Sequence, residues 1–197
     1  MRPSVSFDTL MRIIAGRNRG TQIFAPRGDD TRPTQDRVKE SLFNIIQAYV
    51  PQAVVLDLFA GSGALSFESI SRGAQEASLV DIDREAATCI KRNAEKLGLM
   101  DCIHFYKCEW KQAIKQMSEK GKRFDLVFLD PPYRMMDLSI YCYALASADL
   151  LADGAMMVLE HREGIVPALD ERFELVNERK YGDSGIHFYL FKREESA

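Results

Sequence analysis

Short apolar runs alternate with segments of helical periodicity along most of this chain, from Gln52 onward. Five of the runs are six to eight residues long and apolar almost throughout, which is typical of strands buried on both faces of a sheet. They span residues 53–60, 77–82, 102–108, 124–130 and 155–161. The segments between them place apolar residues three or four positions apart, which predicts helices. These helices are expected at 64–72, 83–99, 109–121 and 138–154.

The order of these elements predicts the fold class. Strands that alternate with amphipathic helices form a parallel sheet with helices on both faces, and right-handed crossovers make this a doubly wound α/β fold of the Rossmann-like type. The C-terminal segments 172–182 and 186–193 are strand-like, with no helix between them. They predict a hairpin. We therefore expect a seven-stranded sheet that ends in antiparallel strands.

A further amphipathic helix is predicted ahead of the sheet, within residues 31–50. Apolar residues recur at helical spacing over 38–49, and Thr34 is the expected N-cap because its hydroxyl can accept a backbone hydrogen bond. We divide the 197 residues into an N-terminal extension that includes this helix, 1–50, and a sheet domain, 51–197. That length is sufficient for one sizeable core.

A glycine-containing turn follows the first predicted strand, in "LDLFAGSGALSFE". Gly61 and Gly63 let a ligand approach the backbone, and the N-terminus of the next helix offers N–H groups. The dinucleotide-binding pattern G-x-G-x-x-G is incomplete, because Ser66 stands at its third glycine. Asp57, just before the turn, would repel a pyrophosphate but can bind an ammonium or hydroxyl group. The turn therefore disfavours an NAD-dependent oxidoreductase and favours a cationic, phosphate-free nucleoside such as S-adenosylmethionine (AdoMet).

Acidic residues also end the second and third predicted strands. Asp81 lies about twenty residues past the glycines, where a carboxylate can accept both ribose hydroxyls of an adenosine. Ile82 beside it is expected to pack on the adenine ring. Glu109 follows the third strand and is placed to meet the adenine edge. A solvent-facing acid at a helix N-terminus explains Glu109 nearly as well.

The fourth predicted strand stops at Asp130, Pro131, Pro132 and Tyr133. Two prolines remove two backbone donors and stiffen the turn, so that the Asp130 carboxylate and the Pro131 carbonyl oxygen keep a fixed direction. Such acceptors suit an exocyclic amine of a nucleobase, whose nitrogen becomes a better nucleophile when both N–H groups are held. Asp130 can also take up the surplus proton. Tyr133 offers a flat face on which an extruded base can stack.

The charge of the chain is unevenly distributed. Residues 1–39 carry eight Arg or Lys against four Asp, which is +4, so the remaining residues sum to −7 for the net charge of −3. A basic leading segment on an acidic body indicates a local contact with a polyanion. A solvated flexible arm is the alternative interpretation of this segment.

The motifs "DLFAGSG", "VDID" and "DPPY" resemble, in order and spacing, those of the class I AdoMet-dependent amino-methyltransferases. Two N-terminal motifs, "MRIIAGRNRG" from Met11 and "RPTQDRVKESLFNII" from Arg32, resemble the RsmD family of bacterial methyltransferases, which modify the N2 amine of one guanine in 16S rRNA. The resemblance covers nearly the whole chain from Met11 and implies the enzyme type that acts on guanine 966. Residues 1–10 precede the usual start of this family, and we expect them to be disordered.

The resemblance implies a role for each motif, with AdoMet as the cofactor and no metal. It places catalysis at Asp130, Pro131, Pro132 and Tyr133. It places AdoMet binding at Asp57, Phe59, Ala60, Gly61, Ser62, Gly63, Asp81, Ile82, Glu109, Trp110 and Asp130. Relatives usually carry Asp or Asn where this chain has Glu109, so at this position the chain departs from the pattern of the family.

The N-terminal arginines are expected to contact RNA. In this interpretation Arg12, Arg17, Arg19 and Arg32 form the RNA-facing edge, where each phosphate contact adds a salt-dependent increment to binding. Arg37 binds RNA or braces the rim of the active site. The expected partner is 16S rRNA, either free or in the 30S subunit or an assembly intermediate of it.

Other expectations concern the state of the protein and weaker site candidates. We expect a cytoplasmic monomer. The four cysteines show no C-x-x-C pairing and no zinc spacing, so they are expected to be small, buried and reduced thiols. No membrane contact is expected, because no apolar stretch approaches the roughly 18 residues that cross a bilayer. Tyr181 and His187 of the C-terminal hairpin are weaker candidates near the base. Glu160 and His161, which end the fifth strand on the ligand side, are weak site candidates. His104 and His187 also fit structural roles. Two alternative functions are adenine-N6 methylation of DNA and non-catalytic RNA binding during ribosome assembly.

Overall fold

The computed structural model describes residues 10–26, 33–132, 137–162, 164 and 166–194. Within these residues, seven strands form one sheet in the order β5-β4-β3-β6-β7-β9-β8. The strands are β3 (Val54–Asp57), β4 (Glu76–Val80), β5 (Ile103–Tyr106), β6 (Phe124–Leu129), β7 (Leu151–Arg162), β8 (Phe173–Tyr181) and β9 (Ser184–Phe191). The helices are α1 (Pro33–Ile45), the 3₁₀ helix η1 (Gln47–Tyr49), α2 (Ala64–Ser71), α3 (Arg84–Leu97), α4 (Trp110–Glu119) and α5 (Ser139–Ser147).

The sheet has the predicted topology. Strands β3 to β7 pair in parallel, whereas β9 is antiparallel to both β7 and β8. The chain is therefore an α/β protein whose seven-stranded sheet ends in an antiparallel hairpin, as its sequence pattern predicts. The parallel strands end together at one edge, here named the carboxyl edge, which is where ligands bind in open α/β sheets.

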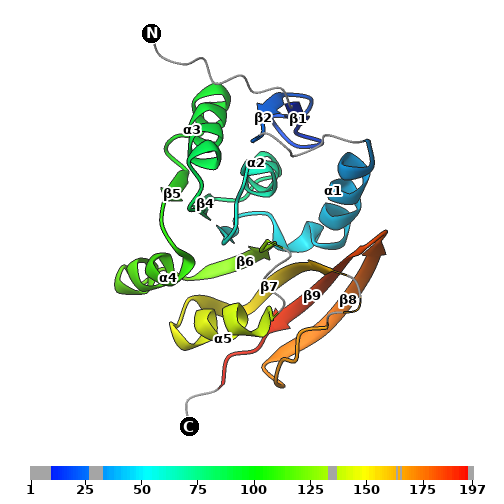
Figure 1. The fold of residues 1–197 in the computed structure, drawn as a ribbon, viewed down its shortest axis with the longest axis vertical. Helices are drawn as coiled ribbons and strands as arrows, with labels where there is room; N and C mark the ends of the chain where they lie inside the picture. The colour runs from blue at the N-terminus through cyan, green and yellow to red at the C-terminus, as the bar shows by residue number, and fades with distance from the viewer. Residues whose placement is uncertain (1–9, 27–32, 133–136, 163, 165, 195–197) are drawn as a thin grey trace.

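Helices cover both faces of the sheet. Figure 1 shows α1, α2 and α3 on one face, here named the α2 face, and α4 and α5 on the other. Alternating strand residues belong to two separate hydrophobic cores. Phe128 and Val158 pack on the α2 face, whereas Val127 and Leu159 pack beneath α4 and α5. The same alternation continues past the core to the carboxyl edge, where it determines which residues point toward α2.

Two predicted boundaries are wrong. The helix expected over 138–154 ends at Ser147, and β7 already begins at Leu151, which pairs with Phe124 of β6. Asp149 has a φ of 58°, in the left-handed region, and this conformation breaks the helix before two buried leucines enter the sheet. The first helix begins at Pro33, so Thr34 lies inside it and is not its N-cap. Proline is well suited to a first helical turn, because its missing N–H needs no partner there.

A small N-terminal hairpin was not predicted. Strands β1 (Leu10–Arg12) and β2 (Gln22–Phe24) pair antiparallel and lie beside α2 and α3, as Figure 1 shows. Leu10 is part of β1, so the disorder expected for residues 1–10 does not extend to it. The first nine residues lie outside the described structure. The basic segment over 10–24 is thus a folded element and not a flexible arm.

The structure bears on two further expectations. Within the described residues, no helix is both long and apolar enough to cross a bilayer. Cys89 and Cys142 are buried as expected for small core thiols, whereas Cys102 and Cys108 are half-buried.

Candidate active site at the carboxyl edge

The turn after β3 is joined to the end of β4 by the carboxylate of Asp81. One carboxylate oxygen accepts a 2.8 Å hydrogen bond from the N–H of Gly61, and the other accepts a 2.8 Å bond from the N–H of Asp83. Asp83 in turn caps α3 by accepting bonds from the N–H groups of Glu85 and Ala86. Asp81 therefore holds the glycine turn in place, in addition to the ribose-binding role expected from the sequence.

The two glycines of the turn have different surroundings. Gly63 has a φ of 78°, and a Cβ atom there would lie 2.8 Å from Cε2 of Phe67 and 2.9 Å from a methyl carbon of Leu79. A Cβ on Gly61 would meet no atom within 4 Å. Packing therefore requires glycine at position 63, whereas the backbone at Gly61 faces open space that a ligand can enter.

Asp57 ends β3 on the α2 face and is almost fully buried. The hydroxyl of Ser66 donates a 2.9 Å hydrogen bond to its carboxylate. Burial raises the pKa of Asp57 to about 7, and the nearby Asp81 carboxylate adds to the rise, while the Ser66 bond opposes it. Ser66, which the sequence presents only as a missing glycine, is thus the residue that orients Asp57.

Further residues expected to bind AdoMet follow the carboxyl ends of β3, β4 and β5. Ile82 is 62% exposed, which is unusual for an isoleucine after a buried strand and leaves its side chain available to a flat ligand. Glu109 is exposed at the N-cap position of α4. Phe59 and Trp110 both pack edge-on against Tyr141 of α5, with ring centroids 5.1 and 4.8 Å away. The structure brings these residues to one edge, and their roles toward AdoMet stay predictions.

Asp130 directly follows β6, the strand that lies between β3 and β7. Asp57 pairs with Phe128, so Asp130 lies two residues beyond Asp57 on the adjacent strand and projects toward the same face. Asp130 is exposed, Pro131 is buried and Pro132 is exposed. Tyr133 lies outside the described residues. Asp130 therefore lies at the carboxyl edge, on the strand next to the one that leads into the glycine turn, and its catalytic role stays a prediction.

The predicted RNA-facing arginines that the structure describes lie at both ends of α2. Arg12 lies near the glycine turn, since Met11 beside it receives a 3.4 Å hydrogen bond from Ser62, and Arg12 Nε forms a 2.7 Å ion pair with Asp36 of α1. Arg37 is exposed one residue further along α1. These two arginines flank the carboxyl edge.

Arg17 and Arg19 instead occupy the tip of the hairpin, at the opposite end of α2. The N–H of Arg17 donates a 2.9 Å bond to the carbonyl oxygen of Ser71, the last residue of that helix. The eight residues of α2 separate this tip from the glycine turn by about 12 Å. The hairpin runs along α2, so the expected RNA-facing arginines are spread over the length of that helix, and their contact with RNA stays a prediction. Arg32 lies outside the described residues.

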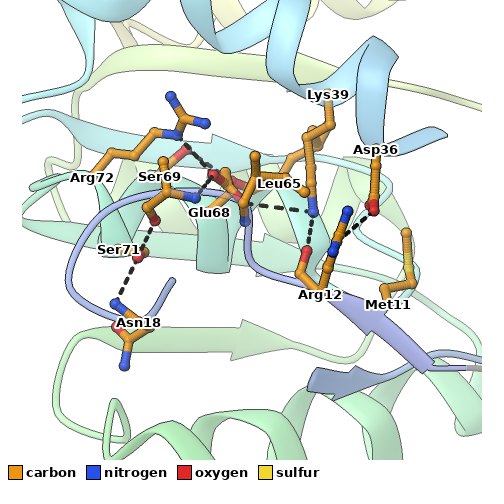
Figure 2. Close-up of polar contacts among 12 residues, drawn as sticks. Met11, Arg12, Asn18, Asp36, Lys39, Leu65, Glu68, Ser69, Ser71 and Arg72 are labelled. Carbon is orange, nitrogen blue, oxygen red and sulfur yellow. Dashed lines mark hydrogen bonds and ion pairs between the residues drawn. The ribbon is translucent and has the colours of Figure 1, made fainter. Parts of the chain in front are cut away.

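A buried carboxylate fastens the hairpin to the sheet domain (Figure 2). Glu68 of α2 is fully buried and accepts hydrogen bonds from the N–H groups of Ile14, at 2.8 Å, and Ala15, at 3.0 Å. Arg72 Nε lies 2.7 Å and Lys39 Nζ 3.5 Å from its oxygens. Two cations and two amides thus surround one carboxylate, which is the arrangement that a buried charge requires.

Two further features hold the hairpin against α1 and α2. Lys39 Nζ also donates a 2.6 Å bond to the carbonyl oxygen of Arg12, so α1 and the hairpin are connected through one ammonium group. A Cβ atom on Gly16 would lie 1.9 Å from the carbonyl oxygen of Ser71, so the loop can approach α2 only because this residue is glycine. Sequence reasoning missed Glu68, although a glutamate inside the otherwise apolar and small-residue pattern of α2 was a visible signal.

The histidines at the hairpin pair with each other. His161 Nε2 and His187 Nδ1 lie 3.0 Å apart, both buried, and His187 Nε2 lies 3.4 Å from the Glu178 carboxylate. Burial lowers the pKa of His187, and His161 lowers it further. By strand alternation both rings project away from the α2 face, and so away from Asp57 and Asp130. This placement supports a structural role for the pair.

Tyr181 has a different position, on the α2 face at the end of β8. Its hydroxyl donates a 2.7 Å hydrogen bond to the hydroxyl of Ser41 on α1. The turn between β8 and β9 lies at the carboxyl edge, because Ser184 at the start of β9 pairs with Arg162 at the end of β7. The bond therefore holds the β8–β9 turn against α1 at the carboxyl edge.

The described residues include no group of three or more His, Cys, Asp or Glu side chains arranged to hold a metal ion. The chemistry of the edge consists instead of carboxylates, backbone amides and an exposed apolar side chain.

Comparison with known proteins places the chain in a family. The family described as "Conserved hypothetical protein 95", which is the RsmD family, matches residues 11–190. The chain belongs to this family. The match begins at Met11, the position from which the N-terminal motifs resemble the RsmD family, and it includes the hairpin, the glycine turn and the C-terminal strands.

Relatives in the RsmD family match almost the whole chain. The "Putative rRNA methyltransferase YlbH" of Bacillus subtilis is 34% identical over 180 residues, which cover 91% of this chain and 98% of that protein. The "Ribosomal RNA small subunit methyltransferase D" of Escherichia coli is 33% identical over 196 residues, covering 98% and 95%. The solved structure of the "Putative methyltransferase yhhF" of Escherichia coli has a TM-score of 0.83 and 31% identity, covering 94% of this chain and all of that one.

Proposed function

We propose that this protein uses AdoMet to methylate the exocyclic N2 amine of one guanine in 16S rRNA, guanine 966 in the enzyme type that it resembles. The observation that carries the proposal is the position of Asp130, which follows β6 directly beside the glycine turn of β3. The names of two relatives, the putative rRNA methyltransferase YlbH and the ribosomal RNA small subunit methyltransferase D, support methylation of rRNA.

The residues at the carboxyl edge fit AdoMet. Asp81 accepts one hydrogen bond at each oxygen and keeps lone pairs for the ribose hydroxyls. Ile82 is exposed beside it for the adenine ring. Open space over Gly61 admits a ligand to the backbone. Asp57 supplies a carboxylate below the turn, where an ammonium group favours its ionised form. Phe59, Trp110 and Glu109 would complete the adenine side.

AdoMet supplies an electrophilic methyl group on a sulfonium. The protein must then present the guanine amine, whose lone pair is delocalised into the ring. Asp130 and the carbonyl oxygen of Pro131 accept its two N–H bonds, which directs the nitrogen lone pair toward the methyl group. Asp130 is also placed to take the proton that the amine loses. Tyr133 would stack on the extruded base.

The RNA would approach along α1 and the N-terminal hairpin. Arg12 and Arg37 flank the carboxyl edge and would contact phosphates, while Arg17 and Arg19 reach RNA only if it extends along α2 toward the hairpin tip. We infer that the substrate is 16S rRNA within the 30S subunit or an assembly intermediate, and that the protein acts as a cytoplasmic monomer.

The proposal is tested by incubating the protein and labelled AdoMet with unmethylated 30S particles, naked 16S rRNA and DNA, and then mapping the labelled base. We expect one guanine of 16S rRNA to carry the label on N2. Labelled adenine in DNA would instead establish the alternative methyltransferase function. RNA binding with no label in any substrate would point to a non-catalytic assembly factor.

A further inference from the structure

A second carboxylate lies beside Asp130 at the carboxyl edge. Leu129 of β6 pairs in register with Leu159 of β7, and β7 continues to Arg162, beyond the end of β6. Glu160 is therefore level with Asp130 on the neighbouring strand. Adjacent strands of a sheet lie about 4.8 Å apart, so both residues can reach the same small ligand.

Both side chains project toward the α2 face. Phe128 and Val158 belong to the core on that face, and Asp130 and Glu160 each lie two residues further along their strands. Side chains two residues apart point to the same side of a strand. Asp57, which pairs with Phe128, has the same orientation.

The surroundings of Glu160 restrain it. On its other side it pairs with Ile186 of β9, and its carboxylate accepts a hydrogen bond from the side chain of Ser184. The bond between Tyr181 and Ser41 holds the adjacent turn against α1. Burial raises the pKa of Glu160, and the bond from Ser184 opposes that rise. A half-buried carboxylate with one fixed partner is oriented, and it gains from a second donor supplied by a ligand.

Guanine and other purines differ in what they offer such an acceptor. Guanine carries two adjacent donors, N1–H and the N2 amine, on its Watson–Crick edge. In 2,6-diaminopurine the 2-amine is present, but N1 is an acceptor that a carboxylate repels. Two carboxylates on neighbouring strands match the adjacent donors of guanine, one for each.

We propose that Glu160 is a specificity-determining residue that recognises guanine by accepting a hydrogen bond from N1–H while Asp130 holds the N2 amine. This inference rests on the proposed guanine-N2 activity and adds to it the residue that reads the base. Sites built to bind a substrate N–H reject analogues without it by large factors, because the buried acceptor is left without a partner.

The test uses 16S rRNA, in the free or reconstituted form that the wild-type protein methylates, with either guanine or 2,6-diaminopurine at the target position. The ratio of kcat/KM for the two RNAs is measured for the wild type and for Glu160→Gln. We expect a wild-type preference for guanine of at least about 100-fold. The glutamine amide can donate to N1 of the analogue as well as accept, so the ratio should fall below about 10-fold.

Two variants serve as controls. Glu171→Gln makes the same change at an exposed position and should keep the wild-type ratio. Ser184→Ala removes the hydrogen bond that orients Glu160 and should also lower the ratio. It provides the test if Glu160→Gln does not fold. AdoMet binding and the unfolding temperature show whether each variant is folded.

The possible failures can be distinguished. Suppose that the wild type methylates guanine and that Glu160→Gln has the same ratio of kcat/KM as the wild type. This result overturns the inference and leaves the proposed function intact. If Glu160→Gln is unfolded, an unchanged ratio in Ser184→Ala has the same meaning. A wild-type protein that labels no guanine overturns both.

Discussion

Glu68 of α2 and Lys39 of α1 form an ion pair in the interior of the protein. The two charged groups lie 3.5 Å apart, with the glutamate side chain fully buried and the lysine side chain only 7% exposed. The N-terminal hairpin is fastened at the same point, because Glu68 accepts two of its backbone N–H bonds and Lys39 donates to the carbonyl oxygen of Arg12. The docking of the basic hairpin therefore depends on one buried carboxylate.

We predict that Glu68→Ala lowers the free energy of unfolding by about 3–5 kcal/mol, because it leaves the Lys39 ammonium and two hairpin amides buried without their acceptor. Urea denaturation measures the loss. Glu95→Ala removes an exposed partner of Lys91 in a 3.9 Å pair and should cost less than about 1 kcal/mol. Similar losses in the two variants would show that the buried cluster does not stabilise the docking.

Asp81→Asn should weaken AdoMet binding by about 30-fold, the equivalent of about 2 kcal/mol for a lost charged acceptor. The variant keeps one carbonyl oxygen, so only one of the bonds to Gly61 and Asp83 survives, and the ribose loses an acceptor as well. Isothermal titration calorimetry measures the affinity, with the exposed Asp101→Asn as the matched control. Unchanged affinity in Asp81→Asn would exclude this residue from the cofactor site.

Asp57 should make stability depend on pH. Its pKa is 3.8 in the unfolded chain and about 7 in the folded protein, so the folded protein retains a proton that the unfolded chain has released. The stability contributed by this proton is complete below about pH 4 and is lost as the pH rises through about 7.

The free energy of unfolding of Asp57→Asn minus that of the wild type should therefore increase by about 2 kcal/mol from pH 5.5 to 7.5. Urea denaturation of both proteins at these two pH values gives the comparison, and other titrating groups cancel in the difference. A difference that does not change with pH would mean that Asp57 is already ionised in the folded protein at about pH 5.5.

Asp130→Ala should reduce the rate of methyl transfer by at least about 100-fold, because the amine loses an acceptor and the route for its proton. AdoMet affinity should change little, since Asp81 and the glycine turn are unaffected. Asp130→Asn keeps an acceptor oxygen and should be impaired less than the alanine variant. Near-normal single-turnover rates in Asp130→Ala would remove this residue from the mechanism.

Replacing Arg12 and Arg37 together with alanine should weaken RNA binding and reduce the slope of log affinity against log salt by about one to two, while AdoMet affinity is kept. The double variant of Arg17 and Arg19 changes the charge equally at the hairpin tip and should have the smaller effect. Filter binding at several salt concentrations provides the slopes. A larger loss in the second variant would indicate that RNA runs along α2 to that tip.

The local pattern of this sequence was enough to predict its fold and the edge of the sheet at which its candidate site residues meet. Apolar strands, helical periodicity and glycine stops are local signals, and the carboxyl ends of parallel strands must meet at one edge, so Asp57, Asp81 and Asp130 could be placed together in advance. The family motifs from Met11 were equally visible in the sequence.

Only the tertiary structure decided how distant segments pack on one another. Three-residue strands such as β1 and β2 carry too few residues for a detectable pattern, so the hairpin and its direction along α2 were missed, and with them the distance between Arg12 and the pair Arg17 and Arg19. The contacts of Glu68 and the position of Glu160 beside Asp130 likewise depend on packing between helices and on strand register. Such partners are far apart in the chain and leave no local periodicity, because what selects them is the free energy of satisfying a buried charge.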